Sequence, residues 1–175
     1  MCCKDSEILS PGGACKQMIV PLPHKVFVYG SLLSNLKNHH VLTDLNHHAR
    51  LVSENCRTVG MFYLTGLKSN EYPYLSEVPL HESQVSHRIT GELYEVSSQA
   101  LDTLDVFEEH PIEYLRSEIE VEDLSPRYED VNGAKLIANV YLLKNELRIA
   151  EAKSVFESKF VIVNDGDWRS HLNKV

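Results

Sequence analysis

The feature that most constrains the fold is a short apolar stretch, Val26-Phe27-Val28-Tyr29, which stops at Gly30. β-Branched and aromatic residues favour a buried strand, and a glycine lets the chain turn sharply and approach other groups closely. Ser31 can cap or turn the chain, and the rough apolar face of residues 32–44 predicts a helix there. Such a corner directs several backbone N–H groups to one point, which suits a small anion such as a carboxylate. The alternative is a plain turn without a ligand.

Several further stretches have the composition or the alternation of β-strands. They are residues 57–64, 72–78, 88–96, 115–121 and 134–143. The run 115–121 alternates clearly between apolar and charged residues, and the run 134–143 is long enough for a central strand. Many strands with few helices predict an α+β fold, in which a small, curved or closed mixed β-sheet, barrel-like in form, carries a few helices.

A second helix is predicted to begin at Ser97 or Ser98, because apolar residues then recur at helical spacing up to Phe107. Pro111 ends the helical pattern within a few residues. Glu108 falls on the apolar face of this helix and near its negative end. Both burial and the helix dipole disfavour the charged carboxylate, so we expect a raised pKa.

A glutamate with a raised pKa is a candidate general acid/base. The alternative is that Glu108 turns outward at the helix end or pairs with Arg116. Tyr114 and Arg116 follow the proline and either line the same site or serve in packing and an ion pair. Asp102 and Asp105 are interpreted as part of a solvated helix face.

Charge and length exclude several classes of protein. The net charge of −8 argues against binding to nucleic acid or to an anionic membrane surface. The chain has no run of about 18 apolar residues and no basic-then-apolar start, so we expect a cytoplasmic protein with no membrane contact. We expect a flexible leader at residues 1–24 and a single domain at residues 25–175, forming a monomer or a weak dimer.

Neither the cysteines nor the histidines form a convincing metal site. The cysteines Cys2, Cys3, Cys15 and Cys56 contain no C-x-x-C pair, which also argues against a disulfide framework. The histidines His39, His40, His47 and His48 lack a motif that would complete a zinc site, and adjacent side chains on a helix point apart. We therefore expect surface or capping histidines and no bound metal.

Taken together, these stretches resemble the gamma-glutamyl cyclotransferase family, and most closely its gamma-glutamylamine cyclotransferase branch. Val26-Phe27-Val28-Tyr29-Gly30-Ser31-Leu32 is similar to the family's V-F-V-Y-G-T/S-L, and Gly91-Glu92-Leu93-Tyr94-Glu95-Val96 to its G-E-V/L-Y-x-V strand. The most specific segment is Leu104-Asp105-x-Phe107-Glu108, which is followed by Pro111, Tyr114 and Arg116. With Gly166-Asp167-Trp168, the matching motifs extend over residues 26–168 in the family's order.

The resemblance implies a reaction that needs no cofactor. The α-amine of a γ-glutamylamine attacks its own γ-carbonyl and closes 5-oxoproline, which releases a free amine such as lysine from γ-glutamyl-ε-lysine. Glu108 is then the general acid/base, and the backbone around Tyr29, Gly30, Ser31 and Leu32 binds the substrate. Tyr29 and Tyr114 pack around the glutamyl group. The alternatives are turnover of γ-glutamyl amino acids or glutathione, and a non-catalytic binding or regulatory domain of the same fold.

Two positions depart from the family's pattern. The glycine of K-x-G-x-x-N is absent, because the chain reads Leu33-Ser34-Asn35-Leu36-Lys37-Asn38. The small residue that often follows the catalytic glutamate is Glu109 here. Neither departure removes a catalytic group, but both are expected to reshape the rim of the pocket.

Overall fold

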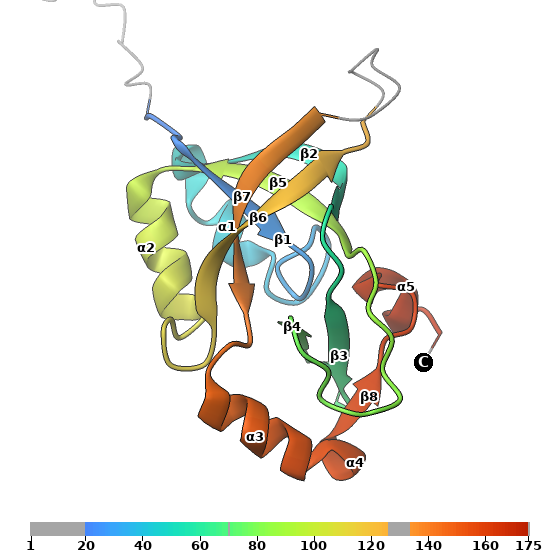
Figure 1. The fold of residues 1–175 in the computed structure, drawn as a ribbon. Helices are drawn as coiled ribbons and strands as arrows, with labels where there is room; N and C mark the ends of the chain where they lie inside the picture. The colour runs from blue at the N-terminus through green and yellow to red at the C-terminus, as the bar shows by residue number, and fades with distance from the viewer. Residues whose placement is uncertain (1–19, 70, 126–133, 175) are drawn as a thin grey trace, which may run out of the picture.

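Two sheets of different size make up the fold in the computed structural model, which describes residues 20–69, 71–125 and 134–174 (Figure 1). The larger sheet is a closed barrel with strand order β1-β5-β2-β6-β7. Its strands are β1 His24–Val28, β2 Ala49–Thr58, β5 Thr90–Val96, β6 Leu115–Asp123 and β7 Ala134–Leu142. The smaller sheet has the order β4-β3-β8, with β3 Tyr63–Leu67, β4 Pro73–Ser76 and β8 Phe160–Ile162. The predicted α+β fold with a closed, mixed sheet is confirmed.

The barrel closes through β1, the strand that the sequence predicts from its apolar stretch. β1 pairs with β5 antiparallel, in the register Val26↔Tyr94, and with β7 parallel, at Val26↔Asn139. Val26, Phe27 and Val28 are buried in the core. Gly91 of β5 is required by close packing, because an added Cβ would lie 2.2 Å from the carbonyl oxygen of Val28.

The helices are short and lie around the two sheets (Figure 1). They are α1 His40–Thr43, the 3₁₀ turn η1 Asn46–His48, α2 Ser98–Phe107, α3 Glu146–Ser154, α4 Phe156–Lys159 and α5 Trp168–Leu172. The predicted start of α2 is confirmed, since the Ser97 side chain accepts a hydrogen bond from the Ala100 amide, 3.1 Å away. None of the described helices is long and apolar enough to cross a membrane.

The prediction of a helix over residues 32–44 was wrong for most of its length. Only His40–Thr43 is α-helical, and the preceding residues form successive turns. Asn35 has a φ of 66°, which a right-handed helix cannot contain. Asn38 closes the loop instead, because its amide donates to the Ser31 carbonyl at 3.0 Å and its side chain to the Ser31 hydroxyl at 2.9 Å.

The predicted strand at 57–64 was also wrong, because it joins the ends of two strands in different sheets. β2 of the barrel ends at Thr58 and β3 of the smaller sheet begins at Tyr63. The other predicted strands correspond to β1, β4, β5, β6 and β7. The predicted leader, residues 1–24, lies mostly outside the described residues, and β1 begins at His24.

Candidate active site

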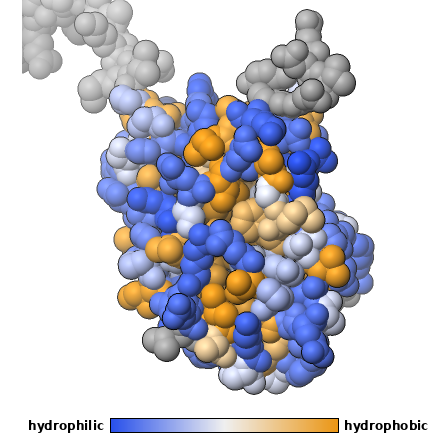
Figure 2. Space-filling view, viewed as in Figure 1, coloured by the Kyte–Doolittle hydropathy of each residue, from blue (hydrophilic) through white to orange (hydrophobic). Residues whose placement is uncertain are grey.

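A cavity of about 350 Å³ opens where β1 ends, beside the start of β4 and the end of α2. It is lined by the predicted site residues Tyr29, Gly30, Ser31, Leu32, Glu108 and Tyr114, together with Phe27, Val28, Asn38, Tyr72, Pro73, Phe107, Glu109, Glu113 and Tyr141. Figure 2 shows apolar side chains gathered down the middle of the viewed face, with polar side chains on both sides. The structure therefore brings together all the residues for which the sequence predicts a role in binding or catalysis.

The corner after β1 forms one wall of the cavity. Gly30 is needed here because an added Cβ would lie 2.8 Å from Cδ of the Pro73 ring. The amides of Gly30, Ser31 and Leu32 donate to no acceptor within the described part of the chain. Unpaired N–H groups beside a cavity suit a carboxylate or a polarised carbonyl oxygen.

Glu108 lines the same cavity and comes immediately after the last residue of α2. Its backbone N–H donates to the Leu104 carbonyl at 2.9 Å, which holds it against the helix. Burial raises the pKa of the Glu108 carboxyl to about 8, although the side chain retains some contact with solvent through the cavity. Among the described residues, no side chain or amide donates a hydrogen bond to its carboxylate. The carboxyl group is therefore available to a ligand and can exchange a proton near neutral pH.

Tyr29 and Tyr114 give the cavity an aromatic lining whose hydroxyl groups are already engaged. The Tyr29 hydroxyl donates to the Tyr141 carbonyl at 2.8 Å, and the Tyr114 hydroxyl to the Pro73 carbonyl at 3.3 Å. Burial raises the pKa of both phenols, and the Glu108 carboxylate adds to the effect. Both tyrosines therefore stay neutral and provide shape, while Glu108 is the group in this cavity with a pKa near 8.

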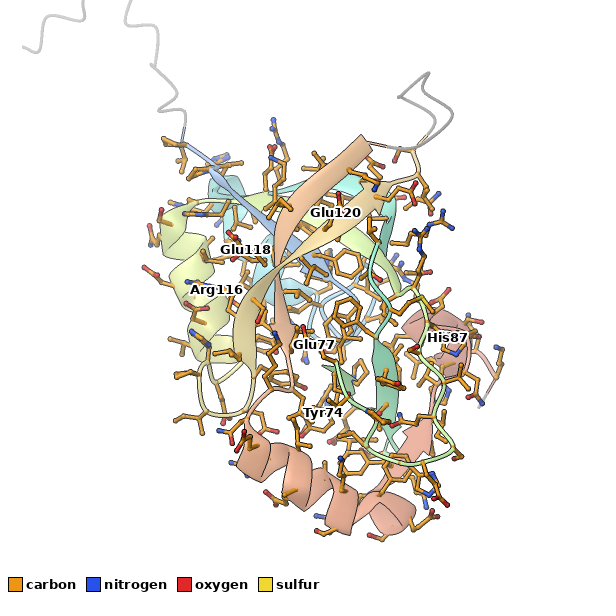
Figure 3. The ribbon with its side chains drawn as sticks, in the orientation of Figure 1. Tyr74, Glu77, His87, Arg116, Glu118 and Glu120 are labelled. Carbon is orange, nitrogen blue, oxygen red and sulfur yellow. The ribbon has the colours of Figure 1, made fainter. Side chains whose placement is uncertain are left out.

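An ion pair fixes the end of α2, but it does not involve Glu108. Arg116 lies on β6 beside α2 (Figure 3), and its Nη1 contacts Oδ2 of Asp105 at 2.7 Å. The Tyr141 hydroxyl donates to the other oxygen of Asp105 at 2.8 Å. The alternative of a Glu108–Arg116 pair is therefore wrong, and so is the interpretation of Asp105 as simply solvated.

Glu92 holds the loop after β1 in place, and the sequence does not predict a role for it at the site. Glu92 is 1% exposed, and one of its oxygens accepts hydrogen bonds from both the amide and the hydroxyl of Ser34, each at 3.0 Å. The Tyr94 hydroxyl donates to this same oxygen at 2.9 Å, and the other oxygen of Glu92 contacts Arg169 of α5. These contacts attach the loop after β1 to the barrel. Strand alternation alone gives no signal for this role, since it cannot show that a distant loop covers Glu92.

Comparison of the sequence with known proteins identifies a family and several relatives. Residues 26–170 match the family described as gamma-glutamyl cyclotransferase, AIG2-like. Gamma-glutamylaminecyclotransferase C of Danio rerio is 37% identical over 101 residues, which are 58% of this chain and 64% of that protein. The gamma-glutamylaminecyclotransferase of Mus musculus is 35% identical over 99 residues, which are 57% of this chain and 64% of that protein. The matches therefore span slightly less than two thirds of each relative.

Solved structures show the same fold. The crystal structure of an AIG2-like protein from Mus musculus is 33% identical in sequence and superposes with a TM-score of 0.56. The superposition covers 68% of this chain and 76% of that chain.

Proposed function

This chain belongs to the AIG2-like gamma-glutamyl cyclotransferase family, and on that premise we propose that it is a gamma-glutamylamine cyclotransferase. Its reaction converts a γ-glutamylamine to 5-oxoproline and a free amine. The observation that carries the proposal is that one cavity is lined both by Glu108, whose carboxyl group has a raised pKa, and by the residues after β1 whose amides are unpaired among the described residues. The names of the matched relatives support the amine branch of the family.

The reaction is an intramolecular acyl transfer. The α-amine nitrogen of the substrate forms a bond to its own γ-carbonyl carbon, and the bond from that carbon to the leaving nitrogen breaks. The protons that the α-ammonium loses are those that the leaving amine gains. The main task of the protein is to hold the substrate folded back on itself, and orientation of this kind can lower a barrier by several kcal/mol.

Glu108 carries the proton in this proposal. Its carboxylate form accepts a proton from the α-ammonium, and the resulting carboxylic acid donates it to the departing nitrogen. The attacking nitrogen loses its second proton as the lactam forms, and the released amine takes up that proton. A pKa of about 8 suits both halves of the cycle, because neither form is strongly favoured near neutral pH. A bound α-ammonium lowers this raised pKa toward neutral pH, because its positive charge favours the carboxylate.

The wall formed by the corner after β1 binds the glutamyl part of the substrate. The amides of Gly30, Ser31 and Leu32 bind the α-carboxylate or polarise the γ-carbonyl as negative charge develops on its oxygen. Tyr29 and Tyr114 pack against the aliphatic carbons, and their neutral hydroxyl groups add no charge there.

The experiment is an assay for 5-oxoproline with the full chain and three compounds: γ-glutamyl-ε-lysine, γ-glutamyl-alanine and glutathione. We expect release from γ-glutamyl-ε-lysine to be the fastest. Faster release from either of the other compounds would move the protein to another branch of the family. If a γ-glutamyl compound bound in calorimetry but none was turned over, the protein would be a binding domain.

A further inference from the structure

Two buried tyrosine rings separate the first cavity from a second, smaller one of about 180 Å³. Tyr114 lines the first cavity and Tyr74 lines the second, while Tyr72 and Glu113 belong to both linings. Tyr74 lies between β4 and α3 (Figure 3), and its ring stacks on that of Tyr114 with the centroids 5.4 Å apart. The stacked pair is therefore the partition between the two cavities.

Hydrogen bonds in both directions join the two short segments that carry this partition, residues 73–74 and residues 113–114. The Tyr74 hydroxyl donates to Oε1 of Glu113 at 2.6 Å. In return, the Tyr114 hydroxyl donates to the Pro73 carbonyl at 3.3 Å. A hydrogen bond to a carboxylate is roughly twice as strong as one between neutral groups. Of the two bonds, the one to Glu113 therefore holds the partition more firmly.

The Glu113 carboxylate is itself held in place. Its Oε2 contacts Nε of Arg148 on α3 at 3.1 Å, while Oε1 remains the acceptor for Tyr74. Burial raises the pKa of the Tyr74 phenol, and the hydrogen bond to Glu113 raises it further. Tyr74 therefore keeps the proton that it donates, and the bond to Glu113 persists at neutral pH.

The partition matters to the reaction through Tyr114, which packs against the glutamyl carbons in the proposed function. The ring of Tyr74 lies directly behind the ring of Tyr114, so a shift of Tyr74 would move this wall of the first cavity. Glu108 is held separately, because its backbone N–H donates to the Leu104 carbonyl of α2 at 2.9 Å. Loss of the Tyr74–Glu113 bond should therefore affect binding of the substrate and spare the transfer of its protons.

We propose that Glu113 is a positioning residue for the wall of the first cavity that contacts the glutamyl group. Its carboxylate fixes Tyr74, and the Tyr74 ring holds Tyr114 where it packs against the substrate. This role rests on the proposed function, which places the glutamyl group beside Tyr114. An aromatic wall contacts the substrate equally in the ground state and in the transition state, so its displacement raises KM and leaves kcat unchanged.

The test is a double-mutant cycle in the full chain, in which release of 5-oxoproline from γ-glutamyl-ε-lysine gives kcat and KM. The cycle consists of the wild type, Glu113→Ala, Tyr74→Phe and the double variant. Glu113→Gln is the conservative variant, because its side-chain amide oxygen still accepts a hydrogen bond from Tyr74. Glu151→Ala is the matched control, because the exposed Glu151 also pairs with Arg148, at 2.9 Å, but makes no hydrogen bond to Tyr74 among the described residues.

We expect Glu113→Ala and Tyr74→Phe each to raise KM by about tenfold, the effect of one lost hydrogen bond to a charged group. Because both substitutions remove the same bond, the KM of the double variant should lie within about threefold of that of either single variant. Glu113→Gln and Glu151→Ala should keep KM within about threefold of the wild type. The kcat should stay within about threefold of the wild type in every variant.

Several results would overturn the positioning role and leave the proposed function in place. One is a wild-type KM in Glu113→Ala, and another is a Glu113→Gln variant as impaired as Glu113→Ala. A KM about 100-fold above the wild type in the double variant would show that Glu113 and Tyr74 act independently. A loss of kcat without a change in KM would place the effect at Glu108. If the wild type released no 5-oxoproline, both the proposed function and this role would be overturned.

Discussion

Asn35 and Glu109 hold left-handed backbone conformations in the two loops that border the first cavity, with φ angles of 66° and 51°. Both are positions at which the sequence departs from the small residues of the family pattern. Asparagine is among the few non-glycine residues that adopt this conformation readily. Asparagine at position 35 therefore holds a backbone conformation that glycine also adopts without strain.

Substitutions at Asn35 test this conformation. We expect Asn35→Val to reduce the free energy of unfolding by roughly 1–3 kcal/mol, because a β-branched residue is strained at positive φ. Asn35→Gly is the matched control and should stay close to the wild type, since glycine adopts this φ without strain. Urea denaturation measures both variants. A valine variant as stable as the glycine variant would show that the loop does not need the left-handed conformation.

The raised pKa of Glu108 makes stability depend on pH. Below about pH 4.5 the carboxyl is neutral in both the folded and the unfolded chain, so its contribution to stability is fully present there. As the pH rises toward 8, the unfolded chain releases this proton and the folded chain retains it, so the wild type loses stability. We expect Glu108→Gln to become more stable than the wild type over this range, by on the order of a few kcal/mol.

Chemical denaturation of the wild type and Glu108→Gln between pH 4 and 8 measures this difference. Glu109→Gln removes a neighbouring, exposed carboxylate that follows the same helix, and it should not reproduce the trend. A stability difference between the wild type and Glu108→Gln that does not change with pH would contradict the raised pKa.

At the scale of elements, the position of α2 decides where Glu108 lies. The helix and its serine cap follow from the sequence, because both depend on spacing within one short segment. The anchor of its far end does not, because Arg116 and Tyr141 reach Asp105 from two different strands, and spacing within the helix does not show how those strands pack against it. The apolar face indicates that Glu108 is buried, but only the packed structure shows that Arg116 pairs with Asp105 and not with Glu108.

Loss of the Arg116–Asp105 ion pair should affect catalysis by shifting the end of α2 and with it Glu108. We expect Arg116→Met to lower the kcat of the cyclisation reaction by about 10- to 100-fold, because small displacements of a catalytic group are costly. Arg50→Met removes an exposed ion pair with Glu95 on the barrel and serves as the control. Steady-state kinetics at saturating substrate measure both, and an Arg116→Met variant with unchanged kcat would show that the ion pair does not position Glu108.

At the scale of the molecule, Glu92 and Arg169 join the barrel, the loop after β1 and the C-terminal helix α5. Arg169 contacts Glu92 and also donates to the Ser34 carbonyl at 3.1 Å. Most strands and the closed sheet are predictable from alternation and turns, because those signals are local. The hydrogen bonds that join Ser34 to Glu92 and to Arg169 link residues 58 and 135 positions apart, so no local pattern predicts them. The short helices and β8 near the C-terminus also lack a clear periodic pattern.

Removal of Arg169 should therefore destabilise the whole fold. We expect Arg169→Met to reduce the free energy of unfolding by about 3–5 kcal/mol, because it leaves the buried Glu92 carboxylate without its cation. The double variant Arg169→Met/Glu92→Gln should recover part of this loss, because it removes the unpaired charge. Guanidinium denaturation of both variants gives the comparison. A single variant no less stable than the double one would contradict this role for the ion pair.

The central claim is that Glu108 carries the proton in the release of 5-oxoproline. The most direct test is the kcat of Glu108→Gln on γ-glutamyl-ε-lysine, measured beside the wild type and Glu109→Gln, with binding of the substrate checked by calorimetry. We predict that Glu108→Gln binds the substrate and loses about 10²- to 10⁴-fold in kcat, which is the usual contribution of a general acid/base. Glu109→Gln should remain active. Turnover by Glu108→Gln at the wild-type rate would contradict the claim.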